Sequence, residues 1–140
     1  MDTDRRMSLE CLSAEQARER GNDEFKRKEY EFAKMSYTHA LRLEPSLHAV
    51  YSNRSFANLK MSLPHLAAAD AWSCVSLCPS FVKGHLRLAD AYIDLGSIQK
   101  AVIALQSAIE GGCAGDSPFG FPEITLHVAC FLSNAHKRNM

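Results

Sequence analysis

Apolar and small residues recur along this chain at helical spacing, and the pattern as a whole repeats every 34 residues. Pro45 and Pro79 are separated by this interval. Three further series show it twice over: Ala33, Ala67, Ala101; Tyr37, Ala71, Leu105; and Ala40, Cys74, Ala108. A fixed period of this length is typical of stacked supersecondary units that share one core. The pattern therefore predicts a repeat array.

Start and stop signals divide each repeat into two helices. Ser13 and Gln16 predict a capping box before the first helix, and Pro45 ends the second because proline disfavours helix at the residue before it. Gly96 is typical of a left-handed cap after the fifth. No strand pattern is convincing. We expect helices at about 14–28, 30–43, 46–60, 64–78, 80–95 and 98–110.

The two ends of the chain carry no repeat signature. Residues 1–13 are polar with mixed charge and are expected to form a leader. Residues 112–122 are dense in glycine and proline and predict an irregular loop. Residues 123–140 are expected to contain a seventh helix, because a stack of hairpins leaves an uncovered apolar face at its end.

Composition limits the classes of function. The 140 residues are 46% apolar, which fits one domain with its own core, and 16 Lys and Arg balance 16 Asp and Glu. This balance favours neither nucleic acid nor membrane as a partner, so any binding charge must be local. The longest apolar runs are too short to span a bilayer, and the first residues lack the apolar core of a secretory signal. Five irregularly spaced cysteines indicate reduced thiols, so we expect a cytoplasmic protein.

The period and the residues at its small and aromatic positions resemble the tetratricopeptide repeat (TPR), a helical hairpin of 34 residues. The resemblance covers three units, at about 14–47, 48–81 and 82–111. It implies an all-α, right-handed superhelix of three hairpins, closed by a C-terminal capping helix. Ala71 departs from the family pattern because an aromatic residue is usual there, and His85 stands at another position that is often aromatic.

Five polar residues occupy the first helices of the three units. Arg18 and Asn22 are four residues apart, as are Lys83 and Arg87, so each pair lies on one helix face, and Asn53 belongs to the unit between them. In the TPR family the first helices line a concave groove, which would bring all five together. They offer many hydrogen-bond donors and fixed positive charge, but no base or nucleophile. Such a set favours a dianion, for instance a C-terminal residue with two carboxylates.

This arrangement is similar to the two-carboxylate clamp of co-chaperone TPR domains. Those domains hold the C-terminal Glu-Glu-Val-Asp of the seventy- and ninety-kilodalton heat-shock chaperones. The resemblance implies that Arg18, Asn22 and Asn53 hold the terminal main-chain carboxylate. It implies that Lys83 meets the aspartate side chain and that Arg87 bonds the peptide further upstream. Arg18 is the one departure, because lysine is usual at that position.

Three neighbouring residues bear on the same groove. Phe25 and Phe56 lie on groove-facing stripes and are candidates for apolar contact with the peptide. Asp90 lies close to the face of Arg87 and has two possible effects that the sequence leaves open. It could repel the carboxylates of the ligand, or it could pair with Arg87 and hold it in place.

Other chemistry finds little support in the sequence. Cys74 and Cys78 are four residues apart on a helix, which could suit a metal, but no further pair of ligands completes a set, so packed thiols are expected. The chain has no HExxH spacing, no phosphate-binding loop and no nucleophile elbow. We therefore expect no metal, no cofactor, no small-molecule substrate and no enzymatic activity.

Two hypotheses from different classes remain. The first is a peptide-binding adaptor that docks the acidic C-terminus of heat-shock protein 70 or heat-shock protein 90. The second is a scaffold whose groove takes a helical or internal segment of another protein, with the clamp unused. They differ in whether the ligand must have a free C-terminal carboxylate.

Overall fold

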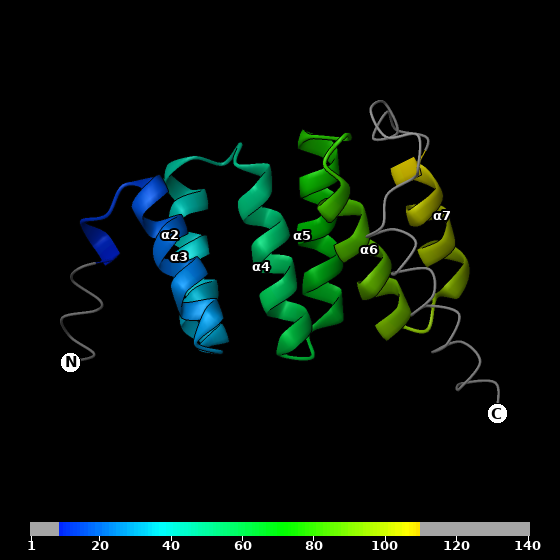
Figure 1. The fold of residues 1–140 in the computed structure, drawn as a ribbon, viewed down its shortest axis with the longest axis horizontal. Coiled ribbons are helices and arrows are strands. Elements are labelled where there is room, and N and C mark those ends of the chain that lie inside the picture. Colours follow the sequence, from blue (N-terminus) through cyan, green and yellow to red (C-terminus); the bar gives the residue numbers. More distant parts are fainter. Residues whose placement is uncertain (1–8, 110–140) are drawn as a thin grey trace.

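The computed structural model describes residues 9–109, and Figure 1 shows them as helices stacked side by side in chain order. Their ends lie within two residues of the predicted positions, which confirms the all-α repeat fold. The loop predicted at 112–122, the capping helix predicted at 123–140 and most of the leader lie outside the described residues. The helices are α2 (Ala14–Lys26), α3 (Tyr30–Leu43), α4 (His48–Lys60), α5 (Pro64–Leu77), α6 (Val82–Asp94) and α7 (Ile98–Ala108).

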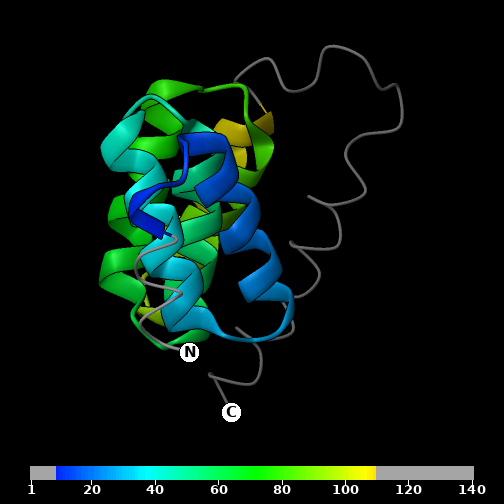
Figure 2. The same ribbon diagram turned by 90° about the vertical axis from the view of Figure 1, so that its left-hand side faces the viewer.

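The helices form two layers. Each repeat is a hairpin, in which α2 packs on α3, α4 on α5 and α6 on α7, and neighbouring hairpins join through α3 with α4 and α5 with α6. The first helices also contact one another, since α4 touches both α2 and α6. Figure 2, viewed along the stack, shows α2 and α3 on different sides of it. We refer to the side formed by α2, α4 and α6 as the inner face and to the side formed by α3, α5 and α7 as the outer face.

The residues of the 34-residue series form the core between these layers. Ala33, Ala67 and Ala101 are fully buried, as is Tyr37, which is 1% exposed. Gly21 lies directly under the Tyr37 ring, because a Cβ atom placed on it would stand 2.5 Å from Cε1 of that tyrosine. Small residues at these positions therefore allow the two helices of a hairpin to approach closely.

The turn inside each hairpin contains one residue in the left-handed region. Gly96 has φ +79°, as predicted, but Lys28 has φ 62° and Ser62 has φ 60° at the matching positions of the first two hairpins. The capping box of Ser13 and Gln16 is also present. In the described part of the chain, no helix combines the length and the apolar character needed to cross a membrane.

Candidate functional site

The predicted amides of the first two hairpins meet on the inner face. Nδ2 of Asn53 donates a hydrogen bond to Oδ1 of Asn22 at 3.2 Å, and the hydroxyl of Tyr37 donates to the same oxygen at 2.7 Å. Burial raises the pKa of Tyr37 well above its usual range, so its hydroxyl remains a donor. Because the oxygen of Asn22 already accepts two bonds, the amide nitrogens of Asn22 and Asn53 carry the N–H groups that can serve a ligand.

These two amides border a cavity of about 220 Å³ together with both predicted aromatic residues. The ring centroids of Phe25 and Phe56 are 4.9 Å apart, so the two rings form one apolar wall. Hydrogen-bond donors and an apolar wall therefore share one hollow. Sequence reasoning missed two residues of its lining, Lys26 and Tyr37.

Arg87, in the third hairpin, contacts one of the two phenylalanine rings that line this cavity. Its guanidinium carbon lies 3.8 Å from the centroid of the Phe56 ring, a cation–π contact between α6 and α4. Its Nη1 atom is 4.0 Å from Oδ2 of Asp90, so the structure shows the pairing that the sequence left open. Lys83 is exposed and lies one helical turn before Arg87. Arg87 thus lies against the aromatic wall, and Lys83 lies one turn away from it on the same helix.

Arg18 lies one turn before Asn22 on α2 and forms an ion pair with Glu15. Its Nε atom is buried and has no hydrogen-bond partner among the described residues. A buried donor without a partner is unfavourable, so a ligand acceptor at this point would be stabilised.

Arg54, which directly follows Asn53 on α4, has a different role. It binds the carboxylate of Asp70 through two nitrogens at 2.6 and 3.0 Å, and Asn58 donates to the same carboxylate at 2.9 Å. Asp70 is only 7% exposed. Adjacent residues of α4 therefore serve opposite faces of the domain, with Asn53 in the groove and Arg54 in a structural network.

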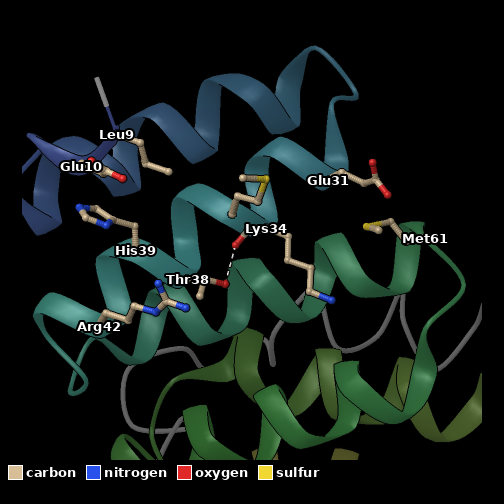
Figure 3. A pocket seen from close by; sticks show the side chains of 9 residues that line it. Leu9, Glu10, Glu31, Lys34, Thr38, His39, Arg42 and Met61 are labelled. Atoms are coloured by element: carbon tan, nitrogen blue, oxygen red, sulfur yellow. Dashed lines mark hydrogen bonds between the residues drawn. The ribbon is translucent and has the colours of Figure 1, made fainter. Parts of the chain in front are cut away.

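A larger cavity of about 570 Å³ lies at the first hairpin, away from the predicted residues (Figure 3). It is lined by α3, by the residues before α2 and by Met61. Glu31 and Lys34 bring opposite charges to it, and His39 is held by a contact of its Nε2 atom with the carbonyl of Leu12 at 3.3 Å. Since its charges are mixed, this cavity has no clear preference for an anion.

Cys74, one of the two cysteines considered as metal ligands, lies in the core. No group of three or more metal-ligating side chains occurs among residues 9–109. Cys74 is fully buried, and burial raises the pKa of its thiol to about 12, so it stays protonated at neutral pH. It packs against Gly84, where an added Cβ atom would stand 2.7 Å from its sulfur.

Comparison with known sequences finds partial relatives of this chain, and no protein-family model matches it. U-box domain-containing protein 70 of Oryza sativa subsp. japonica is 36% identical over 110 residues, which are 79% of this chain and 13% of the relative. The Hsp70-Hsp90 organizing protein of Triticum aestivum is 32% identical over 97 residues, which are 69% of this chain and 17% of the relative. The chain thus spans less than a fifth of the length of these relatives.

Solved structures give matches that cover most of both chains. The TPR domain of Sgt2 from Aspergillus fumigatus has a TM-score of 0.78 at 26% identity and covers 90% of this chain and 81% of its own. TPR2B of yeast Sti1, solved as a complex with pHsp70, has a TM-score of 0.78 at 25% identity, covering 89% and 97%. The second TPR of Spaghetti (RPAP3), bound to the HSP90 peptide SRMEEVD, has a TM-score of 0.67 at 27% identity, covering 69% and 89%. The chain thus has the fold of a tetratricopeptide-repeat domain and is similar to the TPR domains of Sgt2, Sti1 and RPAP3.

Proposed function

We propose that this domain is a peptide-binding adaptor that holds the acidic C-terminal tail of heat-shock protein 70 or heat-shock protein 90. One observation carries the proposal. Asn22 and Asn53 meet across two hairpins, and each amide nitrogen keeps an N–H group for a ligand, beside an apolar wall and the cation of Arg87. The similar domains of Sti1 and RPAP3, solved with pHsp70 and with an HSP90 peptide, support this choice of ligand.

Each clamp residue has a role that fits its chemistry. Asn22 and Asn53 donate neutral N–H groups to the terminal main-chain carboxylate, and Arg18 adds charge and its unpartnered Nε donor. Lys83, exposed on its helix, meets the side-chain carboxylate of the terminal aspartate. Arg87, whose guanidinium lies over the Phe56 ring, bonds the peptide further upstream. The five residues together therefore recognise both carboxylates of the terminal aspartate and the part of the peptide before it.

The cavity beside the amides provides the apolar part of recognition. Phe25 and Phe56 form one wall, and the space of about 220 Å³ fits a branched aliphatic side chain such as the valine that precedes the terminal aspartate. Burial of this side chain contributes about 1.5–3 kcal/mol.

The expected affinity follows from these contacts. Charge-assisted hydrogen bonds contribute roughly 1.5–3 kcal/mol each. After the loss from ordering a flexible tail, on the order of −7 to −8 kcal/mol remains, which is a micromolar dissociation constant. Salt weakens the binding because the pairs are partly exposed. We place this role in the cytoplasm and expect it to be one of binding rather than catalysis.

The test is a titration of the full chain with labelled Met-Glu-Glu-Val-Asp peptide, run beside the same peptide with an amidated C-terminus. We expect micromolar binding that falls by about tenfold or more on amidation and again in Lys83→Ala. Lys34→Ala is the matched control, since it removes a lysine that lines the other cavity of the first hairpin. Equal binding of both peptides, or binding of neither, would instead assign the groove to an internal or helical segment.

A further inference from the structure

A buried polar triad lies between the two helices of the first hairpin. Ser36 donates to Oε1 of Glu24 at 2.7 Å, and Nε of Arg20 lies 3.2 Å from the same oxygen. Glu24 is only 2% exposed. These residues connect α2 to α3, so the carboxylate is satisfied from both helices of the hairpin.

The second hairpin repeats this triad at the matching positions, 34 residues later. Arg54, Asn58 and Asp70 take the places of Arg20, Glu24 and Ser36, with the acid now on the second helix. Arg54 also donates to Thr38 Oγ1 at 3.3 Å and so reaches the preceding hairpin. The space between α3 and α5 is thereby filled by charged and amide groups.

The third hairpin has no such triad at the matching positions. Leu88, Tyr92 and Ala104 stand at the three matching positions, and all three line a cavity of about 330 Å³ between α5, α6 and α7. This volume lies within the range of ligand-binding pockets. Two large apolar side chains at its border are exposed to solvent, Trp72 by 53% and Ile103 by 60%. The third hairpin therefore has an open apolar hollow where the second has an ion pair.

The polar groups of this hollow point to an acidic ligand. Nε1 of Trp72 donates to the hydroxyl of Tyr92 at 2.8 Å, which leaves the O–H of Tyr92 to donate to a further acceptor. Lys100 lies with its Nζ 5.8 Å from the centroid of the Tyr92 ring. None of the residues that line the cavity is acidic. The hollow thus combines an apolar interior with an ammonium and a hydroxyl donor.

We propose that this outer-face cavity docks an acidic amphipathic helix of a partner protein. The helix lies along the groove between α5 and α7, inserts one large apolar side chain beside Trp72, and sets a carboxylate about one turn away against Lys100 and Tyr92. This site is separate from the peptide clamp, because Leu88 and Arg87 are adjacent on α6 and serve opposite faces. The domain can therefore hold a chaperone tail and a second partner together.

The experiment selects displayed helical peptides about four turns long on the full chain, with the inner face saturated by Met-Glu-Glu-Val-Asp peptide. We expect selected peptides to carry a large apolar residue with Asp or Glu one turn away. Their synthetic forms should change the fluorescence of Trp72, the single tryptophan of the chain. Enrichment of basic or extended sequences, no enrichment, or unchanged fluorescence would overturn the proposal.

Two variants test the site itself. Leu88→Arg with Ala104→Asp introduces the arginine and the aspartate of the second hairpin's triad and should fill the cavity, weakening the selected peptides by about tenfold or more. Retained Met-Glu-Glu-Val-Asp binding and an unchanged helical signal show that it folds. Lys100→Gln alters one exposed side chain and should weaken acidic peptides several-fold but not versions with Gln in place of the acid. Full binding by both variants would contradict the assignment.

Other occupants give distinct results in the free protein. An exposed Trp72 should be quenched freely by acrylamide. Resistance to quenching would show that the chain itself fills the cavity, and self-association abolished by Leu88→Arg with Ala104→Asp would assign it to a second copy. Either result would overturn the proposal of a partner helix.

Discussion

The second and third hairpins have the same helix–turn–helix backbone, but their arginines lie on different faces. In α4 the pair Asn53 and Arg54 puts an amide on the inner face and a guanidinium on the outer face. In α6, at the matching positions, Arg87 lies on the inner face and Leu88 lines the outer cavity. Successive residues of a helix point in directions about 100° apart, so a shift of one position moves the charge to the opposite side.

This difference distinguishes an arginine that stabilises the fold, Arg54, from one that we propose to bind the ligand, Arg87. Arg54 is neutralised by Asp70 and contributes to holding two hairpins together, so it offers little to a ligand. Arg87 packs on Phe56 at the edge of a groove with amide donors. In our proposal the third hairpin therefore provides charge for binding and an apolar hollow on its other side, whereas the second provides a buried network.

The largest effect is expected from breaking the network of the second hairpin. Asp70→Ala removes the acceptor of both Arg54 and Asn58, and should lower the free energy of unfolding by about 3 kcal/mol. The value lies at the low end for a buried pair because the Arg54 side chain is 21% exposed and can reach water. Urea denaturation measures it.

The control for Asp70→Ala introduces three residues of the third hairpin at the matching positions of the second. Arg54→Leu with Asn58→Tyr and Asp70→Ala replaces charges and amide together, so it should recover part of the lost stability. A triple variant less stable than Asp70→Ala alone would show that the two hairpins cannot exchange these fillings.

The first hairpin extends the comparison through its glycine. Gly21→Ala places a Cβ atom 2.5 Å from the buried Tyr37 ring. In the other two hairpins Ser55 and Ala89 occupy the matching positions, and Ala71 and Leu105 stand in place of the tyrosine. We expect a loss of about 1–2 kcal/mol, since overpacking exceeds the gain in helix propensity. The displaced Tyr37 should also weaken peptide binding. Thermal unfolding and peptide titration together check both effects, and an unchanged melting temperature would contradict the close approach.

Asn53 and Arg54 provide the sharpest test of opposite faces. Asn53→Ala removes a donor from the groove and should weaken Met-Glu-Glu-Val-Asp binding by about tenfold, with less than about 1 kcal/mol of lost stability. Arg54→Ala should do the reverse, destabilising the domain while peptide affinity changes little. Measuring affinity and unfolding for both variants checks this. Similar profiles for the two variants would refute the division between faces.

The smallest effect concerns the turns. Lys28→Gly and Ser62→Gly place glycine at left-handed positions, and each should stabilise the domain by about 0.5–1 kcal/mol. Gly96→Ala should destabilise it by a similar amount. Differential scanning calorimetry resolves such shifts. Destabilisation by either glycine would show that contacts of Lys28 or Ser62 outweigh backbone strain.

The repeat period predicted most of the fold because burial follows it directly. Ala33, Tyr37 and Cys74 were identified from their spacing alone, and all are buried. The left-handed turns at Lys28 and Ser62 were missed because neither is glycine, although projecting Gly96 back by one and two periods would have found them.

Less of the candidate site could be predicted. The five clamp residues were chosen from their types and spacing and remain a prediction, but the contact between Asn22 and Asn53 depends on how two hairpins stack. The hydrogen bond from the Tyr37 hydroxyl was missed because the 34-residue period indicates a buried core position for this residue. The different roles of Asn53 and Arg54 could not be predicted either, because composition does not reveal which face each of two adjacent side chains serves.

The most direct measurement is a titration of the isotope-labelled full chain with Ser-Arg-Met-Glu-Glu-Val-Asp peptide, followed by the NMR signals of the side-chain amides. We predict saturating shifts for the Asn22 and Asn53 amide groups and for the backbone around Arg87, while Asn58 and the Trp72 indole N–H stay unchanged. Shifts confined to Trp72 and its surroundings, or absent at Asn22 and Asn53, would contradict the assignment of the inner face as the peptide site.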